Sequence, residues 1–486
     1  DGQLCYGRAM RRSLTLRLLA GALCGLPVPG VVAAAAVEYQ LDFASDPGEL
    51  VARVCLREPQ SALRFVLPER DAARQLLDAR RDPDRPLARE DNVLRARDWI
   101  AGECLRLRID LRGVAAGAAR APRPRDGADL LLPTRAWLWR PLGLSGETDT
   151  EVRVELPAGA MLSVPWEPLD RAPHRHFRLD ASDPSWPGMV ALGPFVARDL
   201  AVGSGGLRLA LTGELAPTQQ QTITRHVREA AGDALAAFAP LLDARPQLLV
   251  VPVQGAREAA PFGQSLRGGG TGLMLYVDPR ATLPELRGSW TLTHELVHLA
   301  HPYLGDEGRW IAEGLATWYQ NVLRARAGRI SADQAWRQIA AGIGRGIADP
   351  ADLSLRDTSR AGPGRHTMRL YWSGTALMML GDIALRTRSG SPASLNLALS
   401  RYLACCRARD VRRSPRQFLA ALDREVGGDT LERLYRDYAD DSAFPDVAAA
   451  WQALGISVRE DGTLRYDDAP SAVALRNAIM AGDRGL

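Results

Sequence analysis

Two histidines and two glutamates with the spacing of a metal site lie just past the middle of the chain. His294, Glu295 and His298 form the pattern HELVH, and fourteen residues separate His298 from Glu313. On a helix, residues four apart share a face with Cβ atoms about 5–6 Å apart, so both imidazoles can point at one ion. The pattern predicts a zinc site. The alternative is that these polar residues are merely helix neighbours.

The two glutamates are predicted to have different roles. Glu295 lies roughly 100° around the helix from His294, so it can reach a water bound to the ion rather than the ion itself. A catalytic zinc takes three protein ligands and keeps one position open, which makes Glu313 the natural third ligand. The segment HPYLGDEG between His298 and Glu313 supplies Pro and Gly for a turn, after which a second helix is expected to run back antiparallel.

The elements around these residues alternate between strands and helices. We expect a strand in GLRLALTG, a helix from Pro217 to Leu242, a buried strand in QLLVVPV, a second strand in GLMLYV and then the helix that holds HELVH. This order is typical of an α+β catalytic core, which we place at residues 205–325. Nearly all of the sequence after Gln320 has helical patterns, so residues 326–486 are predicted to form an all-α domain.

The preceding region, residues 37–204, has short runs of alternating polar and apolar residues separated by Pro, Gly and Asp. This pattern predicts a mostly β domain, interrupted by one helical insertion from Pro68 to Arg81. Trp137, Trp139 and Trp166 lie on the expected strands, where aromatic residues are more often core than ligand platforms. The fold class is therefore multidomain, with a β domain, an α+β core and a helical domain, and no repeat of fixed period is present.

The first 36 residues have the layout of a secretory signal peptide that begins at Met10 and follows a short upstream extension. A basic start precedes an apolar run and a stretch of small residues. The apolar run is too short and too broken for a spanning helix, and no later segment is a candidate. A lipid-anchoring signal has a small residue directly before the cysteine. Leu23 precedes Cys24, so a lipid anchor is not expected. We expect an exported chain, periplasmic or secreted, without a transmembrane segment.

The charge of the chain gives no reason to expect a nucleic-acid partner. All 61 basic residues are arginine, which suggests a codon bias, and the formal charge is +4. Removal of residues 1–36, which carry four arginines and one aspartate, would lower it to +1. Nothing in this balance attracts polyanions.

Four cysteines remain after the signal region. Cys55 and Cys104 both lie in strand-like surroundings, so a disulfide is expected between them, with two unpaired buried thiols as the alternative. Cys405 and Cys406 are adjacent on an expected helix. We predict that they do not easily bond each other, and we assign them no metal role.

Three further histidines are considered as alternatives to the metal site. His174 and His176 share one face of an expected strand, but such a pair is weak evidence for a metal, and surface or packing histidines are the favoured interpretation. His301 directly follows the zinc helix and is interpreted as structural.

HELVH followed by WIAEGLATWYQ resembles the gluzincin metallopeptidases, and among them the glycyl aminopeptidase family and its aminopeptidase N relatives. The segment YWSGTALMMLGDIALRTR is similar to the stretch of those families in which a tyrosine, followed three residues later by glycine, assists catalysis; that tyrosine is Tyr371. The tail FLAALDREVGGDTLERLYRDYADD through LGISV also resembles the helical end of the glycyl aminopeptidase family. The resemblance covers about Gly205 to Val458 and is weak in the β domain.

The resemblance implies a zinc-dependent peptidase that acts on peptides or proteins. His294, His298 and Glu313 would hold one Zn²⁺, and Glu295 would take a proton from the zinc-bound water, whose pKa the ion lowers toward 7. Tyr371 would donate a hydrogen bond to the oxyanion of the tetrahedral intermediate. His366 is interpreted either as a residue that orients substrate or tyrosine, or as a loop histidine.

The sequence departs from these families at the place where aminopeptidases bind the free amine of the substrate through a glutamate. Here the chain reads GGGTGLMLY, with no acidic residue before Asp278, which leaves aminopeptidase and endopeptidase activity both open. The backbone of this loop could hold an extended peptide against GLMLYV, expected to be an edge strand; its substrate-binding residues would be Gly268, Gly269, Gly270, Thr271 and Gly272. A different class of function also stays open, an exported non-catalytic binding protein that keeps structural zinc.

Overall fold

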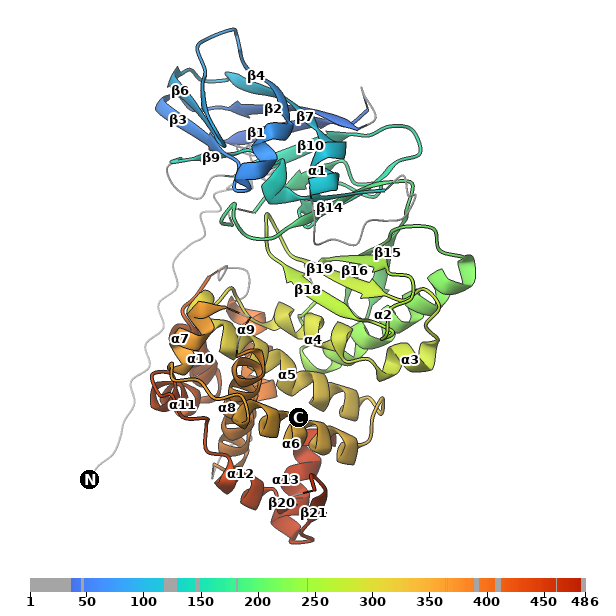
Figure 1. The fold of residues 1–486 in the computed structure, drawn as a ribbon, viewed down its shortest axis with the longest axis vertical. Helices are drawn as coiled ribbons and strands as arrows, with labels where there is room; N and C mark the ends of the chain where they lie inside the picture. The colour runs from blue at the N-terminus through green and yellow to red at the C-terminus, as the bar shows by residue number, and fades with distance from the viewer. Residues whose placement is uncertain are drawn as a thin grey trace, which may run out of the picture. The chain divides into compact units, whose positions relative to one another are not determined.

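The computed structural model describes residues 36–44, 48–117, 129–144, 149–180, 182–242, 244–362, 364, 366–388, 393–406, 412–459 and 461–481. The region from Ala35 to Leu486 forms one compact unit (Figure 1). The predicted signal peptide, residues 1–36, lies outside the described residues apart from Ala36. Among the described residues, none of the helices combines the length and the apolar character needed to cross a bilayer.

Three sheets make up the β-rich region. The first has the order β12-β13-β10-β1-β2-β7-β4, the second β5-β6-β3-β9 and the third β11-β14-β8. Their strands are β1 (Val37–Asp42), β2 (Glu49–Leu56), β3 (Gln60–Val66), β4 (Leu76–Asp82), β5 (Ala88–Glu90), β6 (Val93–Trp99), β7 (Cys104–Asp110), β8 (Leu130–Pro133), β9 (Arg140–Leu142), β10 (Thr150–Glu155), β11 (Met161–Ser163), β12 (Glu167–Pro168), β13 (His176–Arg178) and β14 (Met189–Gly193). A short helix, α1 (Leu111–Gly117), follows β7.

Alternation along these strands builds the core of this region, as expected for half-buried strands. In β1, Val37, Tyr39 and Leu41 are each 1% exposed, whereas the residues between them are not buried. The prediction that three tryptophans belong to this core is confirmed, since Trp137, Trp139 and Trp166 are buried.

The predicted helical insertion from Pro68 to Arg81 is wrong over its second half. Only a 3-10 helix, Arg70–Gln75, is present, and β4 begins directly after it. The Ala-, Leu- and Arg-rich composition favours a helix locally, but pairing with β7 overrides that preference.

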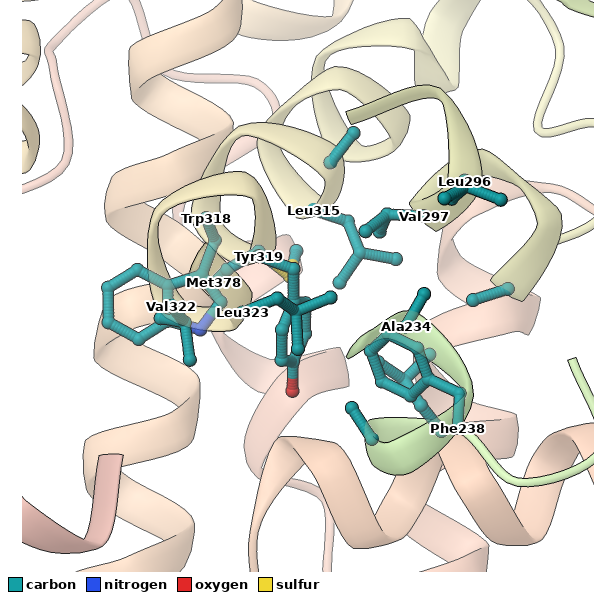
Figure 2. Close-up of a cluster of buried hydrophobic side chains, with 14 of the residues drawn as sticks. Ala234, Phe238, Leu296, Val297, Leu315, Trp318, Tyr319, Val322, Leu323 and Met378 are labelled. Carbon is teal, nitrogen blue, oxygen red and sulfur yellow. The ribbon is translucent and has the colours of Figure 1, made fainter. Parts of the chain in front are cut away.

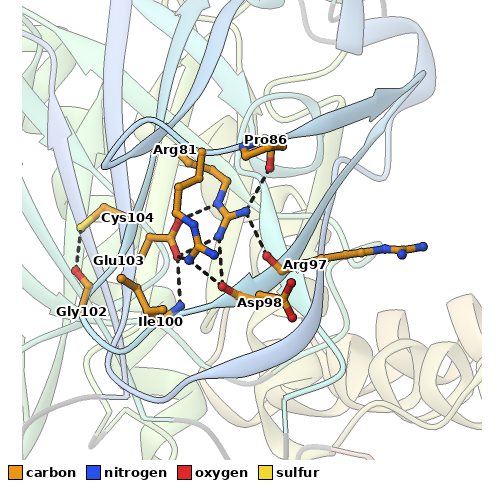
Figure 3. A network of polar contacts seen from close by, with 9 residues as sticks. Arg81, Pro86, Arg97, Asp98, Ile100, Gly102, Glu103 and Cys104 are labelled. Atoms are coloured by element: carbon orange, nitrogen blue, oxygen red, sulfur yellow. Dashed lines mark hydrogen bonds and ion pairs between the residues drawn. The ribbon is translucent and has the colours of Figure 1, made fainter.

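A buried ion pair holds β4 in place (Figure 3). The Arg81 guanidinium donates to both carboxylate oxygens of Glu103, at 2.5 and 2.8 Å, and to the carbonyls of Pro86 and Arg97 at 3.0 Å. Glu103 also accepts from the Ile100 N–H at 3.0 Å. Because both charges are buried, these bonds are needed to offset the cost of removing them from water.

A five-stranded sheet of order β15-β16-β17-β19-β18 begins just before the predicted catalytic core, residues 205–325, and continues into it. The strands are β15 (Val196–Val202), β16 (Gly205–Leu211), β17 (Gln247–Pro252), β18 (Phe262–Leu266) and β19 (Gly272–Val277). Strand β15 falls within the range predicted for the β domain, yet it pairs with β16 in this sheet. The prediction that GLMLYV is an edge strand is wrong, because β18 pairs antiparallel with its outer side.

Three helices belong to the same part of the chain as this sheet: α2 (Pro217–Ala237), α3 (Leu283–Gly288) and α4 (Thr291–Val297). Helix α2 ends five residues before the predicted Leu242. Helix α4, which carries HELVH, lies against β18 and β19 (Figure 1).

The remainder is mainly helical, as predicted, but includes the small hairpin β20 (Ile456–Val458) and β21 (Leu464–Tyr466). The helices are α5 (Arg309–Arg326), α6 (Ala332–Ile347), α7 (Leu355–Ala361), α8 (Thr367–Thr387), α9 (Leu395–Cys406), α10 (Pro415–Val426), α11 (Thr430–Tyr438), α12 (Ala448–Ala453) and α13 (Pro470–Ala481). Figure 2 shows how α2, α4, α5 and α8 share one apolar cluster. Within it, the rings of Phe238 and Tyr319 meet edge to face, with centroids 4.9 Å apart.

Both pairs of cysteines are bonded. The predicted disulfide between Cys55 and Cys104 is confirmed and joins the neighbouring strands β2 and β7. The prediction that Cys405 and Cys406 do not bond each other is wrong. The two residues are the last of α9, and the backbone at the end of a helix is less constrained than in its interior, so their side chains can meet more easily there.

Helices α5 and α8 approach so closely that only glycine fits where they meet. A Cβ atom on Gly374 would lie 1.8 Å from the Trp310 carbonyl oxygen, and one on Gly314 would lie 2.2 Å from the Gly374 carbonyl carbon. Glu313 precedes Gly314, and Tyr371 lies three residues before Gly374. The glycine contact therefore sets how closely the predicted ligand and the predicted tyrosine can approach.

We expect Gly374→Ala to lower the free energy of unfolding by at least about 1–3 kcal/mol, the usual cost of overpacking, because its methyl group has no space. Thermal and denaturant unfolding would measure the change. The matched control is Gly344→Ala in α6, where a Cβ atom meets nothing within 4 Å; it should stabilise by roughly 0.5–1 kcal/mol. Equal effects of the two substitutions would contradict the role of the glycine contact.

Candidate metal centre

Helix α4 presents the three residues of the HELVH motif on a buried surface. His294, Glu295 and His298 are 3%, 6% and 6% exposed. Leu296 and Val297, between them, face the apolar cluster of Figure 2 and anchor the helix. The α-helical turns end at Val297, and His298 opens a 3-10 turn, His298–Ala300, without breaking the shared face of the two histidines.

The two histidines and Glu313 of α5 converge as predicted. The Nε2 atom of His294 lies 3.1 Å from Glu313 Oε2 and 3.2 Å from His298 Nε2. The Nε2 atom of His298 lies 3.5 Å from the same carboxylate oxygen. Donors bound to one tetrahedral ion at about 2.05 Å lie about 3.3 Å apart. The three side chains therefore fit a zinc ion.

The electrostatics of the three ligands agree with this fit. The neighbouring imidazoles hold the pKa of Glu313 well below its ordinary value, against the effect of burial, so that it is a carboxylate. Burial lowers the pKa of His294, but the hydrogen bond to Glu313 outweighs it and the net shift is upward. A metal ion that binds between His294 Nε2 and Glu313 Oε2 would displace the proton that these two atoms share.

Each histidine ligand is oriented by a hydrogen bond from its other ring nitrogen. His294 Nδ1 donates a hydrogen bond to Gln320 Oε1, at a distance of 2.8 Å. His298 Nδ1 lies 2.9 Å from His301 Nε2, and His301 Nδ1 donates to the Pro302 carbonyl at 2.7 Å. Since that carbonyl can only accept, Nε2 of neutral His301 is the acceptor. With Nδ1 of both histidines engaged in this way, Nε2 is the ring atom that is directed toward Glu313 and that a metal ion would take.

Sequence reasoning did not identify these two supporting residues as part of the site. Burial and the nearby Arg267 hold the pKa of His301 well below its ordinary value, which keeps the ring neutral. The interpretation of His301 as structural is too narrow, since its ring fixes the orientation of His298. Gln320 lies seven residues after Glu313, two helical turns along the same face, and that spacing is the signal that could have indicated it.

Glu295 lies beneath β18, the strand that forms the edge of the sheet. A Cβ atom on Gly263 would lie 2.5 Å from Glu295 Cγ, so only glycine at this position allows β18 to pass so close to Glu295. The Ser265 backbone N–H donates to the Glu295 carboxylate. Burial raises the pKa of Glu295, and the two histidines only partly oppose the rise. A carboxylate with a raised pKa is suited to act as a general base.

Tyr371 reaches the same site from α8. Its ring stacks on His294 with centroids 6.0 Å apart and an interplanar angle of 11°. The hydroxyl donates a hydrogen bond to Glu313. Burial and the Glu313 carboxylate raise the pKa of Tyr371 well above its ordinary value, so the hydroxyl keeps its proton and remains a donor.

The glycine loop predicted to bind substrate, Gly268 to Gly272, contacts the β-rich region. The Gly269 N–H donates to Ser182 Oγ at 2.7 Å, and the Gly269 carbonyl accepts from the Asp180 N–H at 3.0 Å. A Cβ atom on Gly270 would lie 2.2 Å from the Pro165 carbonyl oxygen. The backbone beside Glu295 is instead that of Gly263 and Ser265, and a substrate-binding role for the loop stays a prediction.

Three other histidines, His174, His176 and His366, make ordinary polar contacts. His174 Nδ1 lies 2.9 Å from the Asp170 carbonyl and His176 Nε2 lies 2.8 Å from Glu151, which agrees with the expectation of packing or surface histidines. His366 Nδ1 lies 3.1 Å from Asp349, a contact at the start of α8 that fits the loop interpretation.

No protein-family model matches this chain, and no curated protein does so either. Solved structures with the same fold do exist. An aminopeptidase N family protein from Idiomarina loihiensis matches with a TM-score of 0.65 and 11% identity, over 87% of this chain and 79% of that one. The M1 zinc metallopeptidase of Deinococcus radiodurans matches with a TM-score of 0.50 and 17% identity, over 84% and 94%. At such identities the likeness is one of fold, and the chain has the fold of these metallopeptidases.

We expect His301→Leu to weaken Zn²⁺ binding about 10–100-fold, because His298 loses the acceptor that orients it. Competition with a chromophoric chelator would measure the affinity. His301→Gln, whose Oε1 can replace Nε2 as the acceptor, should recover part of it. His226→Leu replaces another buried histidine, on α2, and should leave the affinity unchanged. Zinc binding by His301→Leu that equals the wild type would exclude this role.

Proposed function

We propose that the protein is an exported zinc-dependent metallopeptidase that hydrolyses peptide bonds. The observation that carries the proposal is the meeting of His294, His298 and Glu313 within 3.5 Å. The fold shared with zinc metallopeptidases supports it. Export is supported by the disulfide between Cys55 and Cys104, a bond typical of oxidising compartments.

In this proposal His294, His298 and Glu313 would hold one Zn²⁺, which when bound would make a water more acidic and polarise the substrate carbonyl. Glu295 accepts a proton from the attacking water and passes it to the nitrogen of the leaving amine. Its burial suits both steps, because a raised pKa brings the carboxylate closer to the working pH. The β18 backbone above it fixes its position.

Tyr371 stabilises the charge that develops on the carbonyl oxygen. Its hydroxyl exchanges the bond to Glu313 for one to the substrate oxygen, and a donor that acts mainly in the transition state raises the rate of the chemical step. The stacking on His294 keeps the ring beside the metal ligands. The presence of both Glu295 and Tyr371 favours catalysis over a non-catalytic binding protein with structural zinc.

Strand β18 is the proposed docking edge for an extended peptide. One side of β18 pairs with β19, and no other described strand pairs with its second side. Helix α4 lies against the same strand. An exposed edge can pair with a substrate strand through main-chain hydrogen bonds, which are independent of the substrate sequence. From Phe262 to Gly272 the chain has no acidic residue that could bind a free α-amine, so we propose that cleavage does not require one.

We expect Glu295→Gln to retain one zinc per chain and to lower the hydrolysis of a peptide library by about 10²–10⁴-fold, the usual contribution of general acid–base catalysis. Elemental analysis and product mass spectrometry would measure the two properties. Glu214→Gln changes the same atoms at an exposed position and should match the wild type. A fully zinc-loaded wild type that cleaves no peptide would refute the proposed function.

Paired peptides with free and acetylated N-termini would test whether an amine is needed. Because no carboxylate is available on β18 or its loop, we expect the zinc-loaded protein to cleave both members of each pair at internal bonds. Mass spectrometry would identify the products. Loss of cleavage on acetylation would instead assign an aminopeptidase activity.

A further inference from the structure

The two disulfides within the described part of the chain differ in what they can contribute to stability. Cys55 and Cys104 are 49 positions apart, and a bond that closes a loop of this length restricts the unfolded chain considerably. Cys405 and Cys406 are neighbours, so their bond closes no loop and excludes few unfolded conformations. The bond between Cys405 and Cys406 can therefore add little to the free energy of unfolding, which points to a role other than stabilisation.

The adjacent pair lies at an accessible position. Cys405 is exposed and Cys406 is partly buried, at the end of α9. An exposed disulfide can be reached by a reductant in solution, because thiol–disulfide exchange and related reductions depend on access to a sulfur atom.

A carboxylate from the neighbouring helix completes the cluster. Glu425, near the end of α10, has Oε1 3.6 Å from Cys405 Sγ. The ligand atoms of Cys405, Cys406 and Glu425 all lie within 4.8 Å of one another. Arg401 of α9 donates to the Glu425 main-chain carbonyl at 2.7 Å, which fixes the end of α10 against α9 and keeps the carboxylate near the sulfurs.

We propose that Cys405, Cys406 and Glu425 form a second metal site, specific for a soft or borderline divalent cation, which opens when the disulfide is reduced. A thiol or phosphine reductant supplies two electrons, the S–S bond breaks and each sulfur takes up a proton. The reductant is oxidised to a disulfide or, with an oxygen from water, to a phosphine oxide. The cation then replaces both thiol protons.

The chemistry of the donors separates this site from the zinc centre. Thiolates are soft ligands that favour thiophilic cations, whereas the zinc centre offers imidazole nitrogens and a carboxylate. Two thiolates and one carboxylate carry three negative charges, one more than a divalent cation needs for neutralisation, and they leave one of the four positions of a tetrahedral ion for a water. The proposed site is independent of the peptidase function, since it shares no residue with the zinc centre.

Cadmium titration of the full-length chain tests the proposal. After treatment with a phosphine reductant, Cd²⁺ should produce a thiolate-to-cadmium charge-transfer absorption that exceeds, by one equivalent, that of the double variant Cys405→Ser/Cys406→Ser. The zinc centre contains no sulfur and cannot contribute to this band. Before reduction the wild type and the double variant should be indistinguishable. Glu425→Gln should weaken Cd²⁺ binding on the order of tenfold or more, since loss of a direct ligand costs at least as much as loss of an outer-shell partner.

Each other outcome overturns a stated part of the proposal. Equal absorption by reduced wild type and double variant would assign the band to other cysteines. Stronger absorption by the unreduced wild type than by the unreduced double variant would show that Cys405 and Cys406 are free thiols and that the site needs no reduction to bind a cation. Unchanged affinity in Glu425→Gln, with Glu432→Gln on the adjacent helix α11 as the matched control, would remove the carboxylate from the site.

Discussion

The close contact of α5 and α8 is the constraint on which the candidate active site depends. Glu313, the proposed third metal ligand, and Tyr371 lie on different helices. A hydrogen bond joins their side chains only because the two backbones meet at Gly314 and Gly374. Side chains larger than hydrogen at these positions would push the helices apart by more than a hydrogen bond can tolerate. The apolar cluster shared with α2 and α4 then fixes α5 relative to the two histidines (Figure 2).

The second constraint is the burial of five polar side chains in one place, those of His294, Glu295, His298, His301 and Gln320. An unpaired polar group in such surroundings costs free energy, and each group here has a partner. Gln320 and His301 take the outer nitrogens of the two histidines, Ser265 contributes its N–H to Glu295, and Tyr371 donates to Glu313. These bonds leave the inner faces of His294 and His298 directed at a common point. The chain therefore holds the ligand geometry through its own hydrogen bonds.

Several predictions from the sequence were wrong because the outcome depends on how distant segments of the chain pair. The pattern of GLMLYV indicates a strand, but only the antiparallel partner β18, which has a weakly apolar sequence, makes it an inner strand. The stretch Pro68 to Arg81 has helical composition, and β7 converts half of it into β4. Adjacent cysteines at the end of a helix gave no sign of a bond or of Glu425 beside them, because that glutamate comes from the next helix.

The sequence by itself determined the local features: the shared helix face of His294 and His298, the turn that returns Glu313 to them, the alternation of buried residues in the β-rich region and the helical character of the C-terminal half. These follow from periodicity and short-range spacing, which act within a few turns of chain. The tertiary structure decided which strand covers Glu295, which side chains orient the ligands and how Tyr371 arrives from α8. Those contacts join residues far apart in the chain, and they depend on close packing of whole elements that no local pattern encodes.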